Sequence, residues 1–372
     1  MRNLRRIAAP VAALALSAAA VTGTVLTAPA ALASELTPAQ VAGDTPRATV
    51  TVGPRDVDGG TAYDGSNSLI WRDKIESYHN DRVVEMWAHS PSMNRDVPLV
   101  VIKADQAAGP RPTIYLLNGG DGGEGRANWI MQTDVIDYYL SKNVNVVIPM
   151  QGKFSYYTDW VQDVPALGGK QMWETFLTKE LPEPLEATLG ASNERAIAGM
   201  SMSATTSLLL AEHNPGLYDA VGSFSGCAET SRGLAPEYIR LTLARGGATP
   251  EQMWGPLGTP NWHYNDALIN ADKLRGTEVY VSNASGYAGT EDLWTSPWTG
   301  GDPMNVFVHV VNGGIIEGAT NACTHDLKVK MDSQGVPGNF NFRPTGTHSW
   351  GYWQQDLRDS WPVFARAFGI DG

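Results

Sequence analysis

Apolar runs in the first half of the chain alternate with stretches whose apolar residues recur at helical spacing. Residues 83–88 and 99–103 are rich in β-branched side chains, and the short polar stretch between them predicts an antiparallel pair of strands. Residues 113–117 and 144–149 are apolar almost throughout, as in strands buried on both faces. The segment 128–142 between them has helical spacing and predicts a crossover helix.

The second half of the chain continues this order. Residues 195–199 predict a strand that leads directly into a helix over 201–212, and further strands are expected at 220–224, 278–282 and 340–342. Strands that alternate with helices imply a doubly wound, mainly parallel sheet with helices on both faces. In such a sheet a ligand binds outside the carboxyl ends of the strands, so the residues that follow each strand are the candidates for chemistry.

The N-terminus has the pattern of an export signal. Three arginines precede an Ala/Val/Leu run that ends in Ala31-Leu32-Ala33, which predicts a signal peptide over residues 1–33, cleaved after Ala33. A membrane anchor is the alternative, but Pro10 and the many alanines weaken the run as a span. We expect residues 34–46 to be a flexible mature N-terminus and residues 47–372 to form one catalytic domain.

Charge and cysteine content narrow the class of protein. The formal net charge of −12 argues against a nucleic-acid partner, because phosphate binding requires a clustered basic surface. An exported chain with two cysteines, Cys227 and Cys323, is expected to join them in a disulfide, with two buried thiols as the alternative. The sequence has neither a CxxC motif nor Cys/His metal spacing, so we expect no metal.

The turn between the strand at 195–199 and the following helix contains Gly199-Met200-Ser201-Met202-Ser203. The pattern is close to the Gly-x-Ser-x-Gly nucleophile elbow of the α/β-hydrolase fold, where the turn leaves room only for small side chains around the serine. Ser203 replaces the second glycine and is still small. We expect Ser201 to be a nucleophile and the Met202 N–H to be an oxyanion donor. In the alternative, Ser201 is only a helix N-cap.

A glycine-rich loop over residues 117–123 follows the first buried strand, and Gly120 N–H is expected to be the second oxyanion donor. A phosphate cradle is the alternative, but neither GxGxxG nor a Walker lysine is present.

Of the seven histidines, His348 lies in a C-terminal loop after a strand, as the Ser, acid, His order of this fold requires. Glu291, Asp292 and Glu317 are candidates for the acid, and composition does not choose among them.

Several stretches, together with the elbow, resemble the mycolyltransferases of the antigen 85 type, and more closely their corynebacterial relatives. They are Phe154-Ser155-Tyr156-Tyr157-Thr158-Asp159-Trp160, residues 173–182 (WETFLTKELP), Asn339-Phe340-Asn341-Phe342 and Gly346-Thr347-His348-Ser349-Trp350. The similarity spans roughly residues 80–365. Members of this family transfer a mycoloyl chain from trehalose monomycolate through a serine-bound acyl-enzyme.

The resemblance assigns roles residue by residue. It implies that Ser201 is the nucleophile and His348 the base, and it selects Glu317 as the acid by its position relative to the histidine. Gly120 and Met202 match the two oxyanion donors, and Glu229, Ser349 and Trp350 fall where the family has sugar contacts.

The resemblance also implies no metal and no cofactor. The expected partners are a trehalose mycolate glycolipid and an acceptor hydroxyl, which belongs to trehalose monomycolate, arabinogalactan or a protein. Outer-envelope lipid or cell-wall polysaccharide would surround a protein secreted to the cell envelope.

Two features depart from the family pattern. Its usual Leu-Asp-Gly-Leu-Arg is here Leu117-Asn118-Gly119-Gly120-Asp121, so Asn118 and Asp121 replace an aspartate and an arginine that hold trehalose. Loss of the cation should weaken or redirect acceptor recognition. The segment 287–312, rich in Gly, Trp and Pro, looks like an expanded loop that either shapes the acyl groove or acceptor entrance or is a surface insertion.

Two other functions stay open. One is a secreted carboxylesterase with the same triad, in which water is the acceptor. The other is a non-catalytic cell-wall-binding protein that keeps the fold without turnover.

Overall fold

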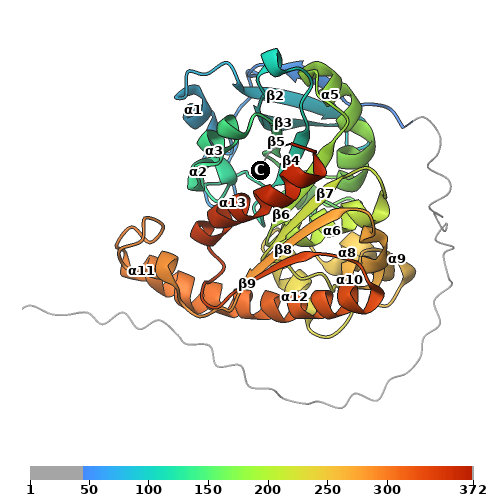
Figure 1. The fold of residues 1–372 in the computed structure, drawn as a ribbon, viewed down its shortest axis with the longest axis vertical. Coiled ribbons are helices and arrows are strands. Elements are labelled where there is room, and N and C mark those ends of the chain that lie inside the picture. Colours follow the sequence, from blue (N-terminus) through green and yellow to red (C-terminus); the bar gives the residue numbers. More distant parts are fainter. Residues whose placement is uncertain (1–44, 371–372) are drawn as a thin grey trace, which may run out of the picture. The chain divides into compact units, whose positions relative to one another are not determined.

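The computed structural model describes residues 45–370, which fold around one nine-stranded sheet with helices on both faces (Figure 1). The expected signal peptide, residues 1–33, lies outside the described residues, and so does most of the expected N-terminal segment 34–46. Within residues 45–370, every helix is too short or too polar to cross a membrane.

The sheet combines an antiparallel start with a parallel block. Its strand order is β1-β2-β3-β5-β4-β6-β7-β8-β9, and all pairs from β5 onward are parallel, whereas β1, β2, β3 and β5 pair antiparallel. This arrangement confirms the predicted doubly wound, mainly parallel sheet. The strands are β1 (Thr49–Val52), β2 (Val83–Ser90), β3 (Arg95–Ile102), β4 (Thr113–Leu117), β5 (Asn145–Pro149), β6 (Arg195–Met200), β7 (Ala220–Phe224), β8 (Glu278–Ala284) and β9 (Asn339–Arg343).

The α-helices fill the connections between strands and the C-terminus. They are α1 (Trp71–Glu76), α2 (Trp129–Gln132), α3 (Val135–Lys142), α4 (Trp173–Thr175), α5 (Pro182–Leu189), α6 (Met202–His213), α7 (Ala235–Ala244), α8 (Pro250–Trp254), α9 (Pro260–Tyr264), α10 (Ala267–Asn270), α11 (Pro303–Phe307), α12 (Gly314–Gln334) and α13 (Trp350–Ala367). Short 3₁₀ segments occur at Gln106–Ala108, Pro165–Leu167, Ala271–Leu274 and Thr290–Asp292, and π-helical turns at Phe176–Glu180 and Val308–Gly313.

One expected element is divided. The predicted crossover helix over 128–142 forms two helices, α2 and α3, with Thr133 and Asp134 between them. The Asn128 side chain caps α2 by accepting from Met131 N–H, and the Thr133 hydroxyl donates to the Trp129 carbonyl oxygen where α2 ends. The backbone of Thr133 is extended, so the helix cannot continue through it.

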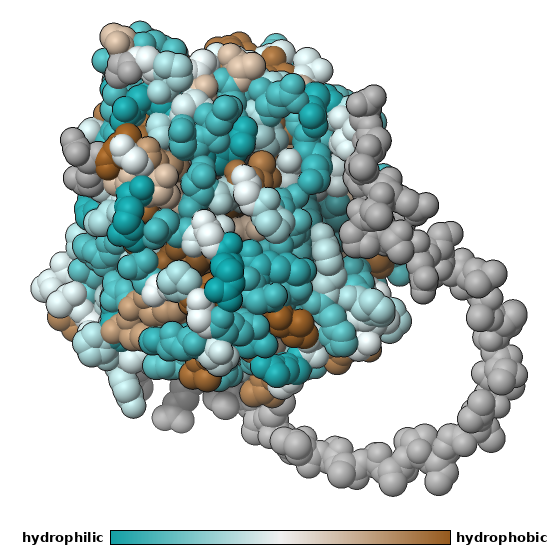
Figure 2. All heavy atoms as spheres, turned by 45° about the vertical axis from the view of Figure 1, so that its right-hand side comes forward, coloured by the Kyte–Doolittle hydropathy of each residue, from teal (hydrophilic) through white to brown (hydrophobic). Residues whose placement is uncertain are grey.

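Alternate side chains of the central strands fill two separate cores. In β4, Tyr115 and Leu117 face one core, and Ile114 and Leu116 face the other. The first core is closed by α5, α6 and α12, and the second by α2, α3 and α13. Strands buried on both faces explain why their sequences are continuously apolar. The molecular face in Figure 2 is mostly hydrophilic, with hydrophobic residues in small separate patches.

Candidate active site

The turn after β6 has the strained geometry of a nucleophile elbow. Ser201 has φ 57° and ψ −121°, a conformation that non-glycine residues rarely adopt, and it directly precedes α6. A Cβ at Gly199 would lie 2.3 Å from the carbonyl oxygen of Ser203, so only glycine fits there. The strain holds the Ser201 side chain at the carboxyl end of a central strand.

Ser203 stands where the usual pattern has a second glycine, and its hydroxyl holds the turn together. Its buried Oγ accepts a hydrogen bond from Met200 N–H at 3.0 Å and lies 3.3 Å from the carbonyl oxygen of Leu117. The hydroxyl therefore joins the elbow to the end of β4. The second glycine position of the elbow requires a small residue, and Ser203 adds hydroxyl hydrogen bonds that a glycine could not make.

Three side chains that are distant in the sequence meet at the elbow. Nε2 of His348 lies 2.7 Å from Oγ of Ser201, and Nδ1 lies 2.9 Å from Oε2 of Glu317. The imidazole edge packs against the ring of Trp353, with ring centroids 4.9 Å apart. The histidine is thus held between a hydroxyl and a carboxylate, which is the arrangement that activates a serine for nucleophilic attack.

Glu317 is fully buried in the first turn of α12, immediately after the π-helical turn. Its second oxygen, Oε1, accepts hydrogen bonds from Ala284 N–H at 2.7 Å, from the Asn283 amide at 2.9 Å and from the Ser225 hydroxyl at 2.9 Å. These donors compensate the cost of burying the carboxylate and leave Oε2 to face the imidazole. The sequence suggested a position for this residue but none of its three donors.

The two other carboxylates that the sequence left open do not touch the imidazole of His348. Asp292 is buried and binds the two residues that flank His348 in the sequence. Its Oδ1 accepts from the Thr347 hydroxyl at 2.6 Å and lies 3.4 Å from the Ser349 hydroxyl. Its Oδ2 accepts from the Tyr352 hydroxyl at 2.8 Å.

Burial alone would raise the pKa of Asp292, but its hydrogen bonds outweigh that effect and lower it, so the group is a carboxylate. No motif in the sequence indicated that Asp292 holds residues 344–349, the loop between β9 and α13 that carries His348 and that we call the histidine loop. Glu291 is partly exposed and points elsewhere, against Gly351.

The two expected oxyanion donors lie in segments that adjoin the elbow. Met202 is the first residue of α6, so its N–H has no carbonyl partner within the helix. Gly120 lies in the loop after β4, and β4 pairs with β6 up to Leu117 opposite Gly199. That loop is packed tightly: a Cβ at Gly122 would lie 2.2 Å from the Lys153 nitrogen.

The expected sugar-contacting residues divide into two groups. Asn118 is fully buried, and its side-chain amide donates to the Pro149 carbonyl oxygen while its side-chain oxygen accepts from Trp129 N–H, so the sugar contact expected of it stays a prediction. Ser349 is also buried and begins α13. Asp121, Glu229 and Trp350 keep accessible surface. Burial and the nearby carboxylates of Asp64 and Glu124 raise the pKa of Asp121 to about 6.

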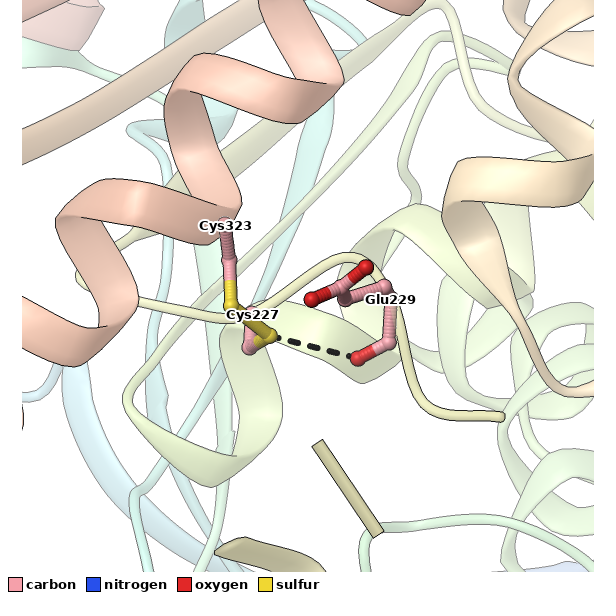
Figure 3. Close-up of side chains that lie close together, drawn as sticks. All are labelled: Cys227, Glu229 and Cys323. Carbon is pink, nitrogen blue, oxygen red and sulfur yellow. Dashed lines mark hydrogen bonds between the residues drawn. A yellow bond between two sulfur atoms is a disulfide. The ribbon is translucent and has the colours of Figure 1, made fainter. Parts of the chain in front are cut away.

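The expected disulfide between Cys227 and Cys323 is present and joins the loop after β7 to α12. Figure 3 shows Glu229 beside it, with the Cys227 sulfur 3.2 Å from the Glu229 carbonyl oxygen. A sulfur bonded to sulfur has no proton to donate, so this is a packing contact. The same three side chains are close enough to surround a cation, but a metal would require thiolates, which the disulfide removes.

The segment expected as an expanded loop, residues 287–312, continues through α11 and the π-helical turn into α12. Figure 1 shows α11 standing out beside the N-terminal end of α12. Large apolar side chains are exposed along it, and the most exposed are Tyr287, Ile315, Met304, Phe307 and Trp294, each with more than half of its surface accessible. We call residues 287–316 the apolar arm. Its last residue, Ile316, directly precedes Glu317 in the sequence.

The chain is similar in sequence to known esterases and acyltransferases. Residues 90–363 match the family model described as putative esterase. The chain is 32% identical over 287 residues to the diacylglycerol acyltransferase/mycolyltransferase Ag85A of Mycobacterium tuberculosis, covering 75% of this chain and 80% of the relative. It is 32% identical to Ag85B of Mycolicibacterium smegmatis, with 75% and 83% covered.

Among solved structures, MPT51 (FbpC1) of Mycobacterium tuberculosis matches with a TM-score of 0.61 at 24% identity, over 75% of this chain and 96% of that chain. At that identity the match shows the fold alone, an α/β-hydrolase fold as the sequence predicts. The sequence matches go further, because they extend over three quarters of the chain. The chain therefore belongs to the esterase family and to the family of the antigen 85 diacylglycerol acyltransferase/mycolyltransferases.

Proposed function

We propose that the protein is an exported serine acyltransferase that moves a mycoloyl chain from trehalose monomycolate to an acceptor hydroxyl through an ester on Ser201. The observation that carries the proposal is the hydrogen-bonded series from Ser201 Oγ through the His348 ring to the buried Glu317. The mycoloyl chain and the trehalose donor come from the family relationship. Export agrees with the N-terminal pattern and with the disulfide, which persists in oxidising compartments.

In the first half-reaction, Ser201 Oγ attacks the carbonyl carbon of the donor ester while His348 Nε2 takes the serine proton. Glu317 keeps Nδ1 protonated and stabilises the imidazolium. Negative charge on the carbonyl oxygen is stabilised by the N–H groups of Gly120 and Met202. The bond to trehalose then breaks, the leaving oxygen receives the proton from His348, and the acyl chain remains on Ser201.

In the second half-reaction the acceptor hydroxyl attacks the acyl carbonyl and gives its proton to His348, which returns it to Ser201 Oγ as the ester bond breaks. Transfer requires the acceptor to be held near the carbonyl so that it outcompetes water. The apolar arm supports a long acyl chain as the transferred group, because it offers exposed apolar side chains and its last residue precedes Glu317 in the sequence.

Incubation with purified trehalose monomycolate, followed by mass spectrometry of lipid products and of the protein, tests the proposal. We expect trehalose dimycolate and an acyl adduct on Ser201. Ser201→Ala should abolish both and leave the melting temperature close to that of the wild type. An adduct on another residue, or full activity in Ser201→Ala, would refute the assignment.

The products of this assay and labelling by a fluorophosphonate probe separate the two other functions. Free mycolic acid as the main product, with acceptor alcohols present, would identify a carboxylesterase. Failure of a fluorophosphonate probe to label Ser201 would favour a wall-binding protein without turnover, since a serine that lacks an activating base seldom reacts.

A further inference from the structure

Two neighbouring cavities lie on the outer side of α13, and neither is lined by the Ser201 or His348 side chains. The first has a volume of about 450 Å³ and the second about 400 Å³, both within the roughly 300–1,000 Å³ of small-molecule sites. They share two lining residues, Trp298 of the apolar arm and Gln354 of α13. We call the pair the α13 groove. Because the cavities share a wall, the groove suits an extended ligand with more than one unit.

The groove combines an aromatic surface with both donors and acceptors of hydrogen bonds. Trp298 keeps accessible surface at the first cavity, next to Glu291, Thr345 and Gln355. Tyr352 also lines this cavity, but it is buried and its hydroxyl donates to Asp292. Arg343 also lines it, and its buried Nη1 has no hydrogen-bond partner within residues 45–370. Because this nitrogen is buried, the polar groups that a ligand can reach in the first cavity include those of Glu291, Thr345 and Gln355, which keep accessible surface.

The charges of the groove balance. Three basic and three acidic residues line the two cavities, and two of the charges, Arg358 and Asp134, are paired with one another at 2.5 Å. The Asp356 carboxylate also neutralises Arg343. A phosphate or an acidic polymer would meet as many carboxylates as cations, so the balance favours an uncharged ligand. The six residues are Lys74, Asp134, Asp137, Glu291, Arg343 and Arg358.

We propose that the α13 groove is an accessory site for a neutral oligosaccharide, separate from the acyl-transfer centre. Sugar rings present apolar C–H faces that stack on aromatic side chains, and hydroxyls that both donate and accept, which matches this lining. Trp298 is already fixed, because its Nε1–H donates to the Gln132 carbonyl oxygen at 3.0 Å. A preorganised ring loses little entropy when a ligand binds. The site does not depend on Ser201 chemistry.

The groove also adjoins the histidine loop. Thr345 lines the first cavity three residues before His348, and Glu291 precedes Asp292, the clamp of that loop. A polysaccharide strand bound there would keep the enzyme next to a carbohydrate surface during turnover, which raises the effective concentration of any hydroxyl on that strand.

Calorimetric titration of the wild-type chain with maltotetraose, arabinotetraose, galactotetraose and inorganic phosphate tests the proposal. We expect saturable binding of at least one neutral tetrasaccharide and none of phosphate. Trp298→Ala should weaken that binding by about tenfold, equal to about 1.4 kcal/mol. Trp294→Ala is the matched control, because Trp294 is exposed on the same arm but does not line the groove. It should change the dissociation constant less than about twofold.

Glu291→Ala provides a second variant in case Trp298→Ala fails to fold, and it should also weaken binding. Binding that neither variant weakens belongs to another site and overturns the proposal. So does the absence of binding by every neutral tetrasaccharide, or binding of phosphate alone. Acyl transfer from trehalose monomycolate, measured separately, reports on the proposed function, so the two can fail independently.

Discussion

At the residue scale, Glu317 has more hydrogen-bond partners than orientation of the histidine requires. A glutamine in its place would have one oxygen and one amide nitrogen for four donors: three around the Oε1 position and the imidazole N–H at Oε2. If the amide nitrogen takes the Oε1 position, it faces the Ala284 N–H, and two donors oppose each other. If it takes the Oε2 position, it donates to Nδ1 of His348 and selects the wrong tautomer of the imidazole. We expect Glu317→Gln to lower kcat by about 10³–10⁴-fold with little change in KM.

Initial rates on a soluble nitrophenyl ester would measure this loss. Circular dichroism should show an intact fold. Activity within tenfold of the wild type would mean that the carboxylate has no part in activating Ser201.

Glu212, in α6, is a buried residue that the proposed mechanism does not use. Both of its carboxylate oxygens are buried without a hydrogen-bond partner within residues 45–370, and burial raises its pKa well above the ordinary value. The native state therefore keeps a proton that the unfolded chain loses above about pH 4.5. This contribution to stability is present at low pH and is lost as the pH rises through the folded pKa.

Glu212→Gln has no proton to lose at this position. We expect its free energy of unfolding, relative to the wild type, to increase by on the order of 1–3 kcal/mol between pH 4 and pH 8. Urea unfolding at both pH values measures the change. A difference that stays constant with pH would show that Glu212 ionises at its ordinary pKa.

The sequence was more informative about the residues of the proposed triad than about the residues that support them. Ser201 and His348 lie in short motifs whose order along the chain is fixed by the fold, so their positions could be predicted. The role of Asp292 could not, because its partner Thr347 is 55 residues away and only the tertiary structure brings them together. Asn118 was expected at the sugar site because it replaces an aspartate of the family pattern. That pattern does not reveal that its side chain is buried and bonded to Pro149 and Trp129.

At the scale of elements, η6 (Thr290–Asp292) fixes the loop between β9 and α13 through the Asp292 carboxylate. Asp292→Asn keeps the shape but replaces one acceptor by an amide nitrogen, which cannot accept from a hydroxyl. We expect kcat to fall by about 10–100-fold because the imidazole loses its fixed position, with KM nearly unchanged. The rate of fluorophosphonate labelling at Ser201 should fall in parallel.

Glu291→Gln is the matched control, since it makes the same change one residue earlier on the same turn. With a short ester as substrate it should behave as the wild type. Equal losses in both variants would assign the effect to the turn as a whole and not to the clamp.

The apolar arm makes a different prediction, which concerns acyl chain length. Met304→Ser with Phe307→Ser removes two exposed apolar side chains from α11. If a long chain lies along the arm, each methylene buried there contributes up to about 0.8 kcal/mol. We expect kcat/KM for a palmitoyl ester to fall about tenfold and that for a butyryl ester to stay unchanged.

Leu257→Ser is the control, because Leu257 is equally exposed but lies in the loop between α8 and α9. It should affect neither ester. Equal losses on the short and the long ester in the arm variant would show that the arm supports the fold of the site and does not bind the chain.

The elements that the sequence predicted best are those whose burial is complete. The strands β4 and β7 begin and end where their apolar runs do, since both faces of each strand are covered. The helices of the apolar arm could not be predicted in this way. Its hydrophobic residues are exposed, so their spacing along the sequence does not indicate which face of an element is buried. The division of the crossover helix depended on the local bonds of Asn128 and Thr133, which an apolar pattern does not reveal.

At the scale of the whole molecule, two hydrophobic cores lie on opposite faces of one sheet, and the site lies at the sheet's carboxyl edge, where loops from both halves meet. The disulfide crosslinks the loop after β7, which provides Ser225, to α12, which provides Glu317. The sequence separation of the two cysteines is 96 residues. Closing a loop of this size in the unfolded chain stabilises the native state by about 4–5 kcal/mol in the chain-entropy model.

Replacing both cysteines, Cys227→Ser with Cys323→Ser, should therefore lower the free energy of unfolding by about 4 kcal/mol in urea titrations. Treating the wild type with dithiothreitol should give a similar decrease, and dithiothreitol should have no effect on the double variant. Because the crosslink also holds α12 against the loop that hydrogen-bonds Glu317, we expect ester hydrolysis to be lost at lower urea than secondary structure in the double variant. A loss of less than about 1 kcal/mol, with both transitions coincident, would mean that the two cores alone hold the site in place.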